Sequence, residues 1–271
     1  MLALHGLTAS RAVWRPLAER LPTGLALLAP DLPGRGESPP APSGRYRLRD
    51  ELRRLRSALA SRGASPRVVV GHSQGAALAV ALASTDPSVR ALILCSPVCP
   101  WTSRPPLLDL LRGAGPAARR IVPPLRRPVV RWVLRHRVYA DPTRADGAAV
   151  DRYAGPWASP GRAAELPGIV ADWNPSALWP YFPPPPIRLR VLVGEEDRRV
   201  PPEDAARLAR AAAGEIRVLS GAAHGLPEER PDAVASALAA VAAESRAGSE
   251  REGDARFEAD SSETGADGHQ E

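Results

Sequence analysis

Hydrophobic residues along the chain fall into short, nearly continuous runs, separated by longer stretches in which apolar residues recur every three or four positions. Runs rich in Val, Leu and Ile and bounded by Gly or Pro are typical of strands buried on both faces of a parallel sheet. Such runs predict strands at Leu2–His5, Gly24–Pro30, Arg67–Gly71, Ala91–Cys95, Arg188–Val193 and Glu215–Leu219.

The stretches between these runs have the pattern of amphipathic helices. In Arg47–Arg62, for example, leucines recur at a spacing that places them on one helical face. Helices are predicted at Trp14–Arg20, Arg47–Arg62, Gln74–Ser84, Pro202–Ala212 and Pro231–Ala243. Because strands and helices alternate, the sequence predicts an α/β fold with a mostly parallel, doubly wound sheet.

The alternation stops between residues 97 and 187, where prolines accumulate and five of the six tryptophans lie. Helices are expected in this segment at Leu107–Arg112, Arg126–Arg137, Arg144–Tyr153 and Ala163–Asp172. We interpret it as a helical cap inserted between two strands, at the carboxyl edge of the sheet, where ligands bind in such folds. A proline-rich connection without a binding role is the alternative.

The remaining boundaries follow from composition. Residues from about 245 onward are mostly Glu, Asp, Ser, Ala and Gly, and they cannot bury enough apolar surface to fold. The expected organisation is therefore a core in two parts, 1–96 and 188–244, a cap at 97–187 and a disordered acidic tail at 245–271.

Charge and apolar content exclude several classes of protein. All 36 basic residues are arginines, but they form no stripe interleaved with aromatic residues, so no nucleic-acid partner is expected. No apolar run reaches the ~20 residues of a membrane span. Met1–Leu4 leads directly into His5 without the charged start of a signal peptide, and we expect a cytoplasmic protein without an integral membrane segment. Cys95 and Cys99 match no zinc spacing, so no metal site is expected.

The sharpest chemical signal is the pentapeptide Gly-His-Ser-Gln-Gly at residues 71–75. A β-branched run precedes it and an Ala-rich helical stretch follows, which is the context of a nucleophile elbow. In that turn the serine hydroxyl stands clear at the sheet edge, and glycines two positions away let strand and helix approach closely. Ser73 is therefore the candidate nucleophile, and the backbone N–H of Gln74 is a candidate oxyanion donor.

Together these segments resemble the α/β-hydrolase superfamily from residue 1 to about residue 243. Residues 4–7 are similar to the family's oxyanion loop, 31–38 to its D-x-x-G-x-G-x-S segment, and 194–197 and 221–224 to its acid and histidine loops. The resemblance implies that Leu7 supplies the second oxyanion N–H. Members of the family usually have two antiparallel strands before the oxyanion loop, whereas this sequence begins on the strand that leads into that loop. Either the protein does not have those strands, or its start codon was assigned too far downstream.

A serine needs a base to be nucleophilic at neutral pH, and elimination among the five histidines identifies it. His269 lies in the tail, His136 in the cap and His72 beside the serine within the elbow. In the family, the histidine corresponding to His5 shapes the oxyanion loop. His224 remains as the candidate base, because it follows the last predicted strand at the same sheet edge.

The base in turn needs an acid that fixes its tautomer and stabilises its charge. Glu195, Glu196 and Asp197 all follow the strand that ends near residue 194. Resemblance to the family points to Asp197, and the two glutamates are chemically able alternatives. The chain order Ser, Asp, His is the one expected for this fold.

These residues predict an esterase-like serine hydrolase (EC 3.1) that cleaves a carboxylic ester or thioester of a small, largely apolar substrate through an acyl-enzyme on Ser73. Candidate substrate contacts are His5, Trp101, Trp157 and Trp173, although the tryptophans are equally suited to packing the cap's own core. Three alternatives share the scaffold: a serine acyltransferase or perhydrolase, a C–C bond hydrolase of vinylogous diketones, and a non-catalytic binding protein. We expect no cofactor and a small-molecule partner, and the sequence does not specify an oligomeric state.

Overall fold

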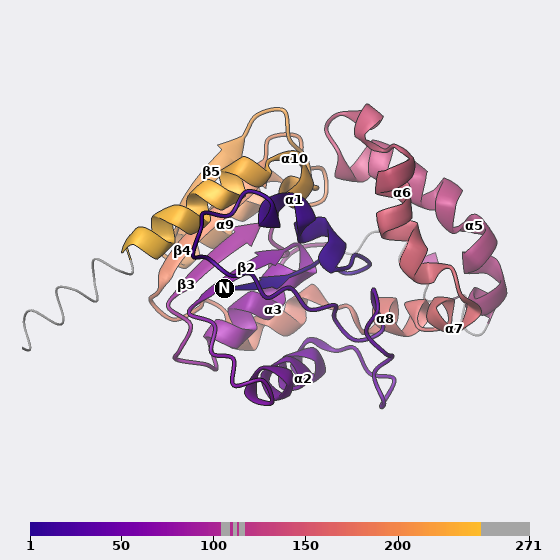
Figure 1. Ribbon diagram of the computed structural model, residues 1–271, viewed down its shortest axis with the longest axis horizontal. Coiled ribbons are helices and arrows are strands. Elements are labelled where there is room, and N and C mark those ends of the chain that lie inside the picture. Colours follow the sequence, from indigo (N-terminus) through magenta and orange to yellow (C-terminus); the bar gives the residue numbers. More distant parts are fainter. Residues whose placement is uncertain (104–108, 111–112, 114–116, 245–271) are drawn as a thin grey trace, which may run out of the picture.

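The computed structural model describes residues 1–103, 109–110, 113 and 117–244. Within them, five parallel strands form one sheet in the order β1-β2-β3-β4-β5 (Figure 1). The strands are β1 (Leu2–Leu4), β2 (Val68–His72), β3 (Ala91–Cys95), β4 (Arg188–Gly194) and β5 (Glu215–Leu219). Each strand coincides with a hydrophobic run, and the predicted parallel sheet is confirmed.

Helices cover both faces of the sheet. On one face, α2 (Leu48–Ala60), α3 (Gln74–Ala83) and α9 (Pro202–Ala211) share an apolar core with the strands. On the other face, α1 (Arg15–Ala18) and a helix at residues 231–244 enclose a second apolar core. Strands β1 to β4 therefore lie between two apolar layers, which is the predicted doubly wound arrangement. The edge strand β5 was expected to be buried, but of its residues only Leu219 is.

The predicted strand Gly24–Pro30 is corrected by the structure. It contributes only a single bridge, in which Leu28 pairs with Leu2 at the edge of the sheet. Gly24 turns at a positive φ of 88°, and Pro30 has no N–H with which to extend a ladder. Only the middle of the run is therefore able to pair with β1.

The predicted helix Trp14–Arg20 is also shifted. A 3-10 turn, η1 (Arg11–Trp14), begins after Ser10 and is followed by the four-residue α1. The Ser10 hydroxyl accepts a hydrogen bond from the N–H of Ala12, which caps this turn and moves the start of the helical segment upstream.

Between β3 and β4 the described residues form helices and turns and no strand. The longest helix, α5 (Ala118–Val133), continues into a π-helical turn, η3 (Leu134–Val138). The later elements are η4 (Pro142–Arg144), α6 (Gly147–Ala154), η5 (Gly155–Trp157), α7 (Pro160–Ala163), α8 (Leu166–Asp172) and η6 (Pro175–Tyr181).

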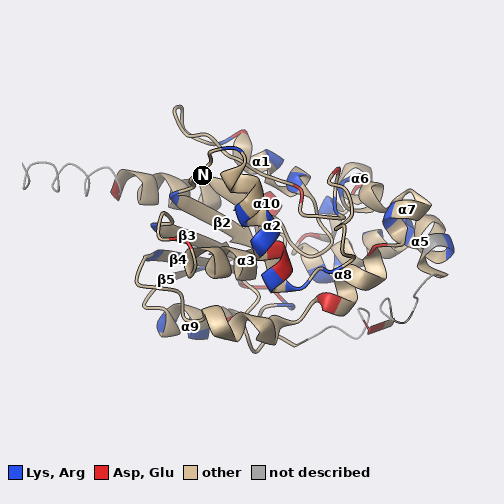
Figure 2. Ribbon diagram, turned by 90° about the horizontal axis from the view of Figure 1, so that it is seen from below, with Lys and Arg blue, Asp and Glu red and all other residues tan. Residues whose placement is uncertain are grey.

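This helical insertion between two strands was predicted and is confirmed. Figure 1 shows α5, α6 and α7 grouped beside the sheet, and Figure 2 shows basic positions along α5 in a second view. The helix expected at Leu107–Arg112 falls mostly outside the described residues, as does the whole tail from residue 245. Among the described helices, none combines the length and apolar character needed to cross a membrane.

Candidate active site

Ser73 lies in the turn between β2 and α3. Its φ of 55° and ψ of −117° belong to a region that residues with side chains rarely adopt. A Cβ at position 75 would lie 2.1 Å from the carbonyl oxygen of Leu4, and one at position 71 would lie 2.6 Å from the Cα of Ala76. Glycine is therefore required on both sides of the serine if strand and helix are to meet there.

His224 lies between Ser73 and Asp197. Its Nε2 is 3.0 Å from Ser73 Oγ, and its Nδ1 is 3.0 Å and 3.2 Å from the two carboxylate oxygens of Asp197. The three residues follow β2, β5 and β4, so the parallel sheet brings them together at its carboxyl edge. The side chains of Glu195 and Glu196, the alternative acids, are exposed, and the hydrogen bonds to the His224 ring come from Asp197.

The carboxylate of Asp197 is buried and heavily hydrogen-bonded. Its Oδ1 accepts the backbone N–H groups of Arg199 and Val200, each at 2.9 Å. Burial works to raise the pKa of Asp197, but the His224 ring and the Val200 N–H outweigh it and lower that pKa to about 2. Asp197 is therefore ionised at neutral pH and accepts a proton-bearing Nδ1, which leaves Nε2 of His224 facing Ser73.

Two buried contacts fix the loop that carries His224. Nε2 of His72 donates to the carbonyl oxygen of His224 at 2.7 Å, and the N–H of Ala223 donates to a carboxylate oxygen of Glu229 at 3.0 Å. Burial, followed by the charge of His224, lowers the pKa of His72 to about 3. The ring is therefore neutral, and its single N–H is committed to the loop. Sequence reasoning missed this contact because the two residues are 152 positions apart.

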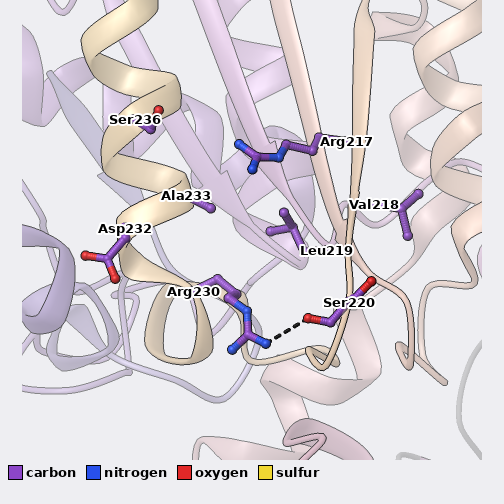
Figure 3. Close-up of a pocket in the computed structure, with 8 residues that line it drawn as sticks. All are labelled: Arg217, Val218, Leu219, Ser220, Arg230, Asp232, Ala233 and Ser236. Atoms are coloured by element: carbon purple, nitrogen blue, oxygen red, sulfur yellow. Dashed lines mark hydrogen bonds between the residues drawn. The ribbon is translucent and has the colours of Figure 1, made fainter.

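Arg230 supports the same loop. It follows the short helix α10 (Leu226–Glu229), and its guanidinium donates to the carbonyl oxygens of Ser220 and Gly221, each at 2.7 Å. Figure 3 shows the contact with Ser220. The open pocket around it contains no candidate catalytic residue. Its lining residues are Arg217, Val218, Leu219, Ser220, Arg230, Asp232, Ala233 and Ser236.

The two candidate oxyanion donors are joined by a buried arginine. Leu7 lines the same cavity as Ser73, and Gln74 is the first residue of α3, so its N–H is among those without a partner inside the helix. Nε of Arg35 donates to the carbonyl oxygen of Leu7 at 2.7 Å, and another guanidinium nitrogen donates to the Gln74 side chain at 3.3 Å. A fully buried salt bridge to Glu51 holds the arginine.

Sequence reasoning did not identify Arg35 or Glu51 as parts of the site. The available signal was the segment at residues 31–38, which contains Arg35 and resembles a family motif. The position of Glu51 on the buried face of α2 has no comparable signal, since its partner is in a different element.

The structure places His5 next to the candidate oxyanion residues, buried and outside the residues that line the cavity. Its Nε2 accepts the N–H of Leu32 at 2.9 Å, and its Nδ1 donates to the carbonyl oxygen of Gly6 at 2.8 Å. Burial, followed by the charge of Arg35, lowers the pKa of His5 to about 4. His5 therefore supports the loop as a neutral ring.

The three candidate tryptophans occupy different environments. Trp157 lines the cavity, and its indole N–H donates to the carbonyl oxygen of Thr8 at 3.3 Å. Trp101 instead packs against Trp179, with ring centroids 6.1 Å apart, and Trp173 is buried in the core of the insertion. Of the three, the structure brings only Trp157 to the cavity.

A cavity of about 700 Å³ lies over Ser73 and His224, a size typical of small-molecule sites. Helix α5 supplies much of its apolar wall, through Ile121, Val122, Leu125, Val129, Val130 and Val133. Among the described residues, the lining contains the ionisable side chains of His72, His224 and Tyr153. It also contains those of Asp109, Arg126 and Arg199. In the described part of the chain, no group of three or more His, Cys, Asp or Glu side chains is suited to hold a metal ion.

Comparison with known proteins agrees with the fold. Residues 1–237 match the family model of the alpha/beta hydrolase family. The chain belongs to this family. This α/β-hydrolase is 40% identical over 98 residues to lipase LipV of Mycobacterium tuberculosis, and the match covers 36% of each chain, so it spans about a third of that relative.

Two solved structures extend the comparison. An α/β-hydrolase fold protein from Burkholderia ambifaria is similar with a TM-score of 0.78, at 23% identity and over 88% of each chain. A thermophilic esterase from Thermogutta terrifontis, solved with malate bound, has a TM-score of 0.69 at 26% identity, over 88% of this chain and 86% of that one. The family model, the lipase and the esterase support a hydrolase activity, and the Burkholderia structure shows the fold alone.

Proposed function

We propose that this α/β-hydrolase is a serine hydrolase that cleaves a carboxylic ester or thioester of a small, largely apolar substrate. The observation that carries the proposal is the continuous contact from Asp197 through His224 to Ser73 Oγ, with 3.0 Å at each step. The names of the lipase and esterase relatives point to the same class of reaction.

The reaction begins when Ser73 Oγ attacks the carbonyl carbon of the substrate and transfers its proton to His224 Nε2. Asp197 stabilises the imidazolium that forms. When the tetrahedral intermediate collapses, His224 gives the proton to the leaving alcohol or thiol, and the acyl group remains on Ser73. His224 then removes a proton from a water molecule, which attacks the acyl-enzyme. When this second intermediate collapses, His224 returns the proton to Ser73 Oγ, the acid leaves, and the serine is restored.

The negative charge on the carbonyl oxygen is stabilised by the backbone N–H groups of Leu7 and Gln74. Donors of this kind typically supply about 3 kcal/mol each to the transition state. Arg35 holds the two donors in position relative to each other, because its guanidinium contacts both Leu7 and Gln74.

The helical insertion at 97–187 serves as the cap over this site. Its helix α5 presents an apolar wall toward the cavity that contains Ser73. Such a wall holds the apolar part of the substrate and excludes bulk water, which strengthens the polar interactions at the reacting carbonyl.

Hydrolysis of p-nitrophenyl esters with acyl chains of two to eight carbons tests the proposal. Ser73→Ala and His224→Ala should abolish nearly all activity, whereas Ser61→Ala and His136→Ala, which change exposed side chains, should retain it. Equal activity of Ser73→Ala and Ser61→Ala would refute the proposal. Adding an alcohol or peroxide to the assay measures acyl transfer in competition with water.

A further inference from the structure

Arg199 lines the cavity together with Ser73 and His224. Its backbone N–H donates to Asp197, but across the described residues its guanidinium makes no hydrogen bond or ion pair. The side chain is partly buried. A charged group removed from water is costly unless it is paired, so this guanidinium is suited to bind an anion that enters the cavity.

The charges around Arg199 also favour an anion as the partner of its guanidinium. Asp197 is close enough to influence it, but that carboxylate already accepts hydrogen bonds from His224 and from two backbone N–H groups. The other influential neighbour, Arg137 on η3, is a like charge. Burial, together with Arg137, lowers the pKa of Arg199, yet an arginine side chain remains protonated at neutral pH.

The rest of the cavity is complementary to an apolar chain. Apart from Arg126, the α5 side chains that line it are aliphatic, and several, including Ile121, Leu125 and Val129, are exposed to the extent of 42–50%. Exposed aliphatic side chains on the wall of a cavity favour an apolar ligand, because binding removes them from water.

We propose that Arg199 binds the carboxylate or phosphate of an amphipathic substrate whose apolar chain lies against α5. The proposal rests on the serine hydrolase function proposed above and names the substrate class of that site. Within the part of the chain that the structure describes, one other arginine, Arg126 on α5, also lines the cavity, and one of its guanidinium nitrogens donates to the carbonyl oxygen of Pro123. Arg126 is therefore the competing position for the same anion.

Binding measured without turnover tests the assignment. Ser73→Ala protein is titrated by calorimetry with octanoate, octyl phosphate and octanol, which share one chain and differ in charge. We expect at least one anion to bind about tenfold to a hundredfold more tightly than octanol, the range expected for a charge-assisted hydrogen bond. The octanoate and octyl phosphate arms separate a carboxylate site from a phosphate site.

Three further substitutions on the Ser73→Ala background locate the site. Arg199→Gln should reduce the preference for the anion to near unity, whereas Arg198→Gln, which removes an exposed neighbouring charge, should leave it unchanged. The assignment is overturned if Arg199→Gln keeps the preference, if Arg126→Gln removes it instead, or if neither anion binds more tightly than octanol.

A second experiment separates failure of this inference from failure of the proposed function. It measures how strongly octanoate, octyl phosphate and octanol inhibit ester hydrolysis by the wild-type protein. Ester hydrolysis that depends on Ser73, without any anion preference, would leave the function standing and overturn the role of Arg199. Binding of an anion that depends on Arg199, in a protein without esterase activity, would do the reverse.

Discussion

His224 is held from two sides by residues of different charge. The ionised carboxylate of Asp197 accepts from the ring, and the neutral ring of His72 donates to the backbone carbonyl of the same residue. The first contact sets which ring nitrogen bears the proton, and the second sets where the loop lies. Ring orientation and position are therefore controlled separately, by residues that follow or end different strands.

Replacing the acid tests the first contact. Asp197→Asn keeps the shape of the side chain, but an amide can present either its oxygen or its N–H group to Nδ1 of His224. The ring then no longer has one fixed tautomer. We expect kcat for p-nitrophenyl butyrate to fall by about 10⁴-fold. Glu196→Gln, an exposed neighbour, is the matched control and should behave like the wild type. A larger loss of kcat in Glu196→Gln than in Asp197→Asn would show that Glu196, and not Asp197, is the acid that supports His224.

The buried neutral histidines make stability depend on pH. The pKa values of His72 and His5 are lowered from 6.5 to about 3 and about 4, so the unfolded chain takes up protons below pH 6.5 that the folded protein does not. The unfolded state then binds more protons, and the free energy of unfolding decreases as the pH falls from 6.5 to 4. Each histidine contributes up to about 1.4 kcal/mol per pH unit.

Urea unfolding between pH 7 and pH 4.5 measures this dependence. His72→Gln retains an N–H donor for the loop but does not titrate, so its stability should fall less steeply with decreasing pH than that of the wild type. His136→Gln, at an exposed position, should reproduce the wild-type slope. Parallel slopes for His72→Gln and the wild type would contradict the account.

At the scale of elements, the site depends on how closely β1, β2 and α3 approach one another. Gly75→Ala would drive a Cβ to 2.1 Å from a backbone oxygen of β1, and backbone cannot move aside as a side chain does. We expect a loss of about 3 kcal/mol in the free energy of unfolding, measured in urea. Gly161→Ala, where a Cβ meets nothing within 4 Å, should cost nothing comparable. Equal losses in the two variants would mean that the turn has room for a Cβ at position 75.

The difference between local signals and long-range contacts explains which features the sequence could predict. The elbow at residues 71–75 and the five strands were predictable because their signals are local: a run of apolar residues, a glycine spacing, a following helix. The contacts of Arg35 with Leu7 and of His72 with the His224 carbonyl join residues 28 and 152 positions apart, and local patterns carry no information about them. Gly24–Pro30 has the composition of a strand, but backbone geometry limits its pairing.

At the scale of the whole molecule, a buried glutamate joins the insertion to the loop of the candidate base. Glu228 of α10 accepts the hydroxyl groups of Tyr139 and Tyr153 at 2.9 Å and 2.7 Å, and Nε of Arg152 donates to it at 2.9 Å. The three partners lie between η3 and the end of α6. The position of the insertion over the cavity is therefore tied to the same loop that presents His224.

Removing this charge should loosen the insertion. Glu228→Gln leaves Arg152 without its partner, and since that arginine is partly exposed we expect a cost of about 2 kcal/mol in the free energy of unfolding. Limited proteolysis should also cut within residues 118–181 earlier than in the wild type. Glu203→Gln, on the exposed face of α9, is the control. An unchanged cleavage pattern in Glu228→Gln would show that other contacts hold the insertion.

Covalent labelling of the folded protein tests the central claim most directly. A fluorophosphonate reacts with an activated serine, whose oxygen displaces fluoride from phosphorus, and mass spectrometry of the digested protein locates the adduct. The account predicts one adduct, on the peptide that contains Ser73, with no adduct in Ser73→Ala and very slow labelling in His224→Ala. An unlabelled wild type, or an adduct on another residue that persists in Ser73→Ala, would contradict it.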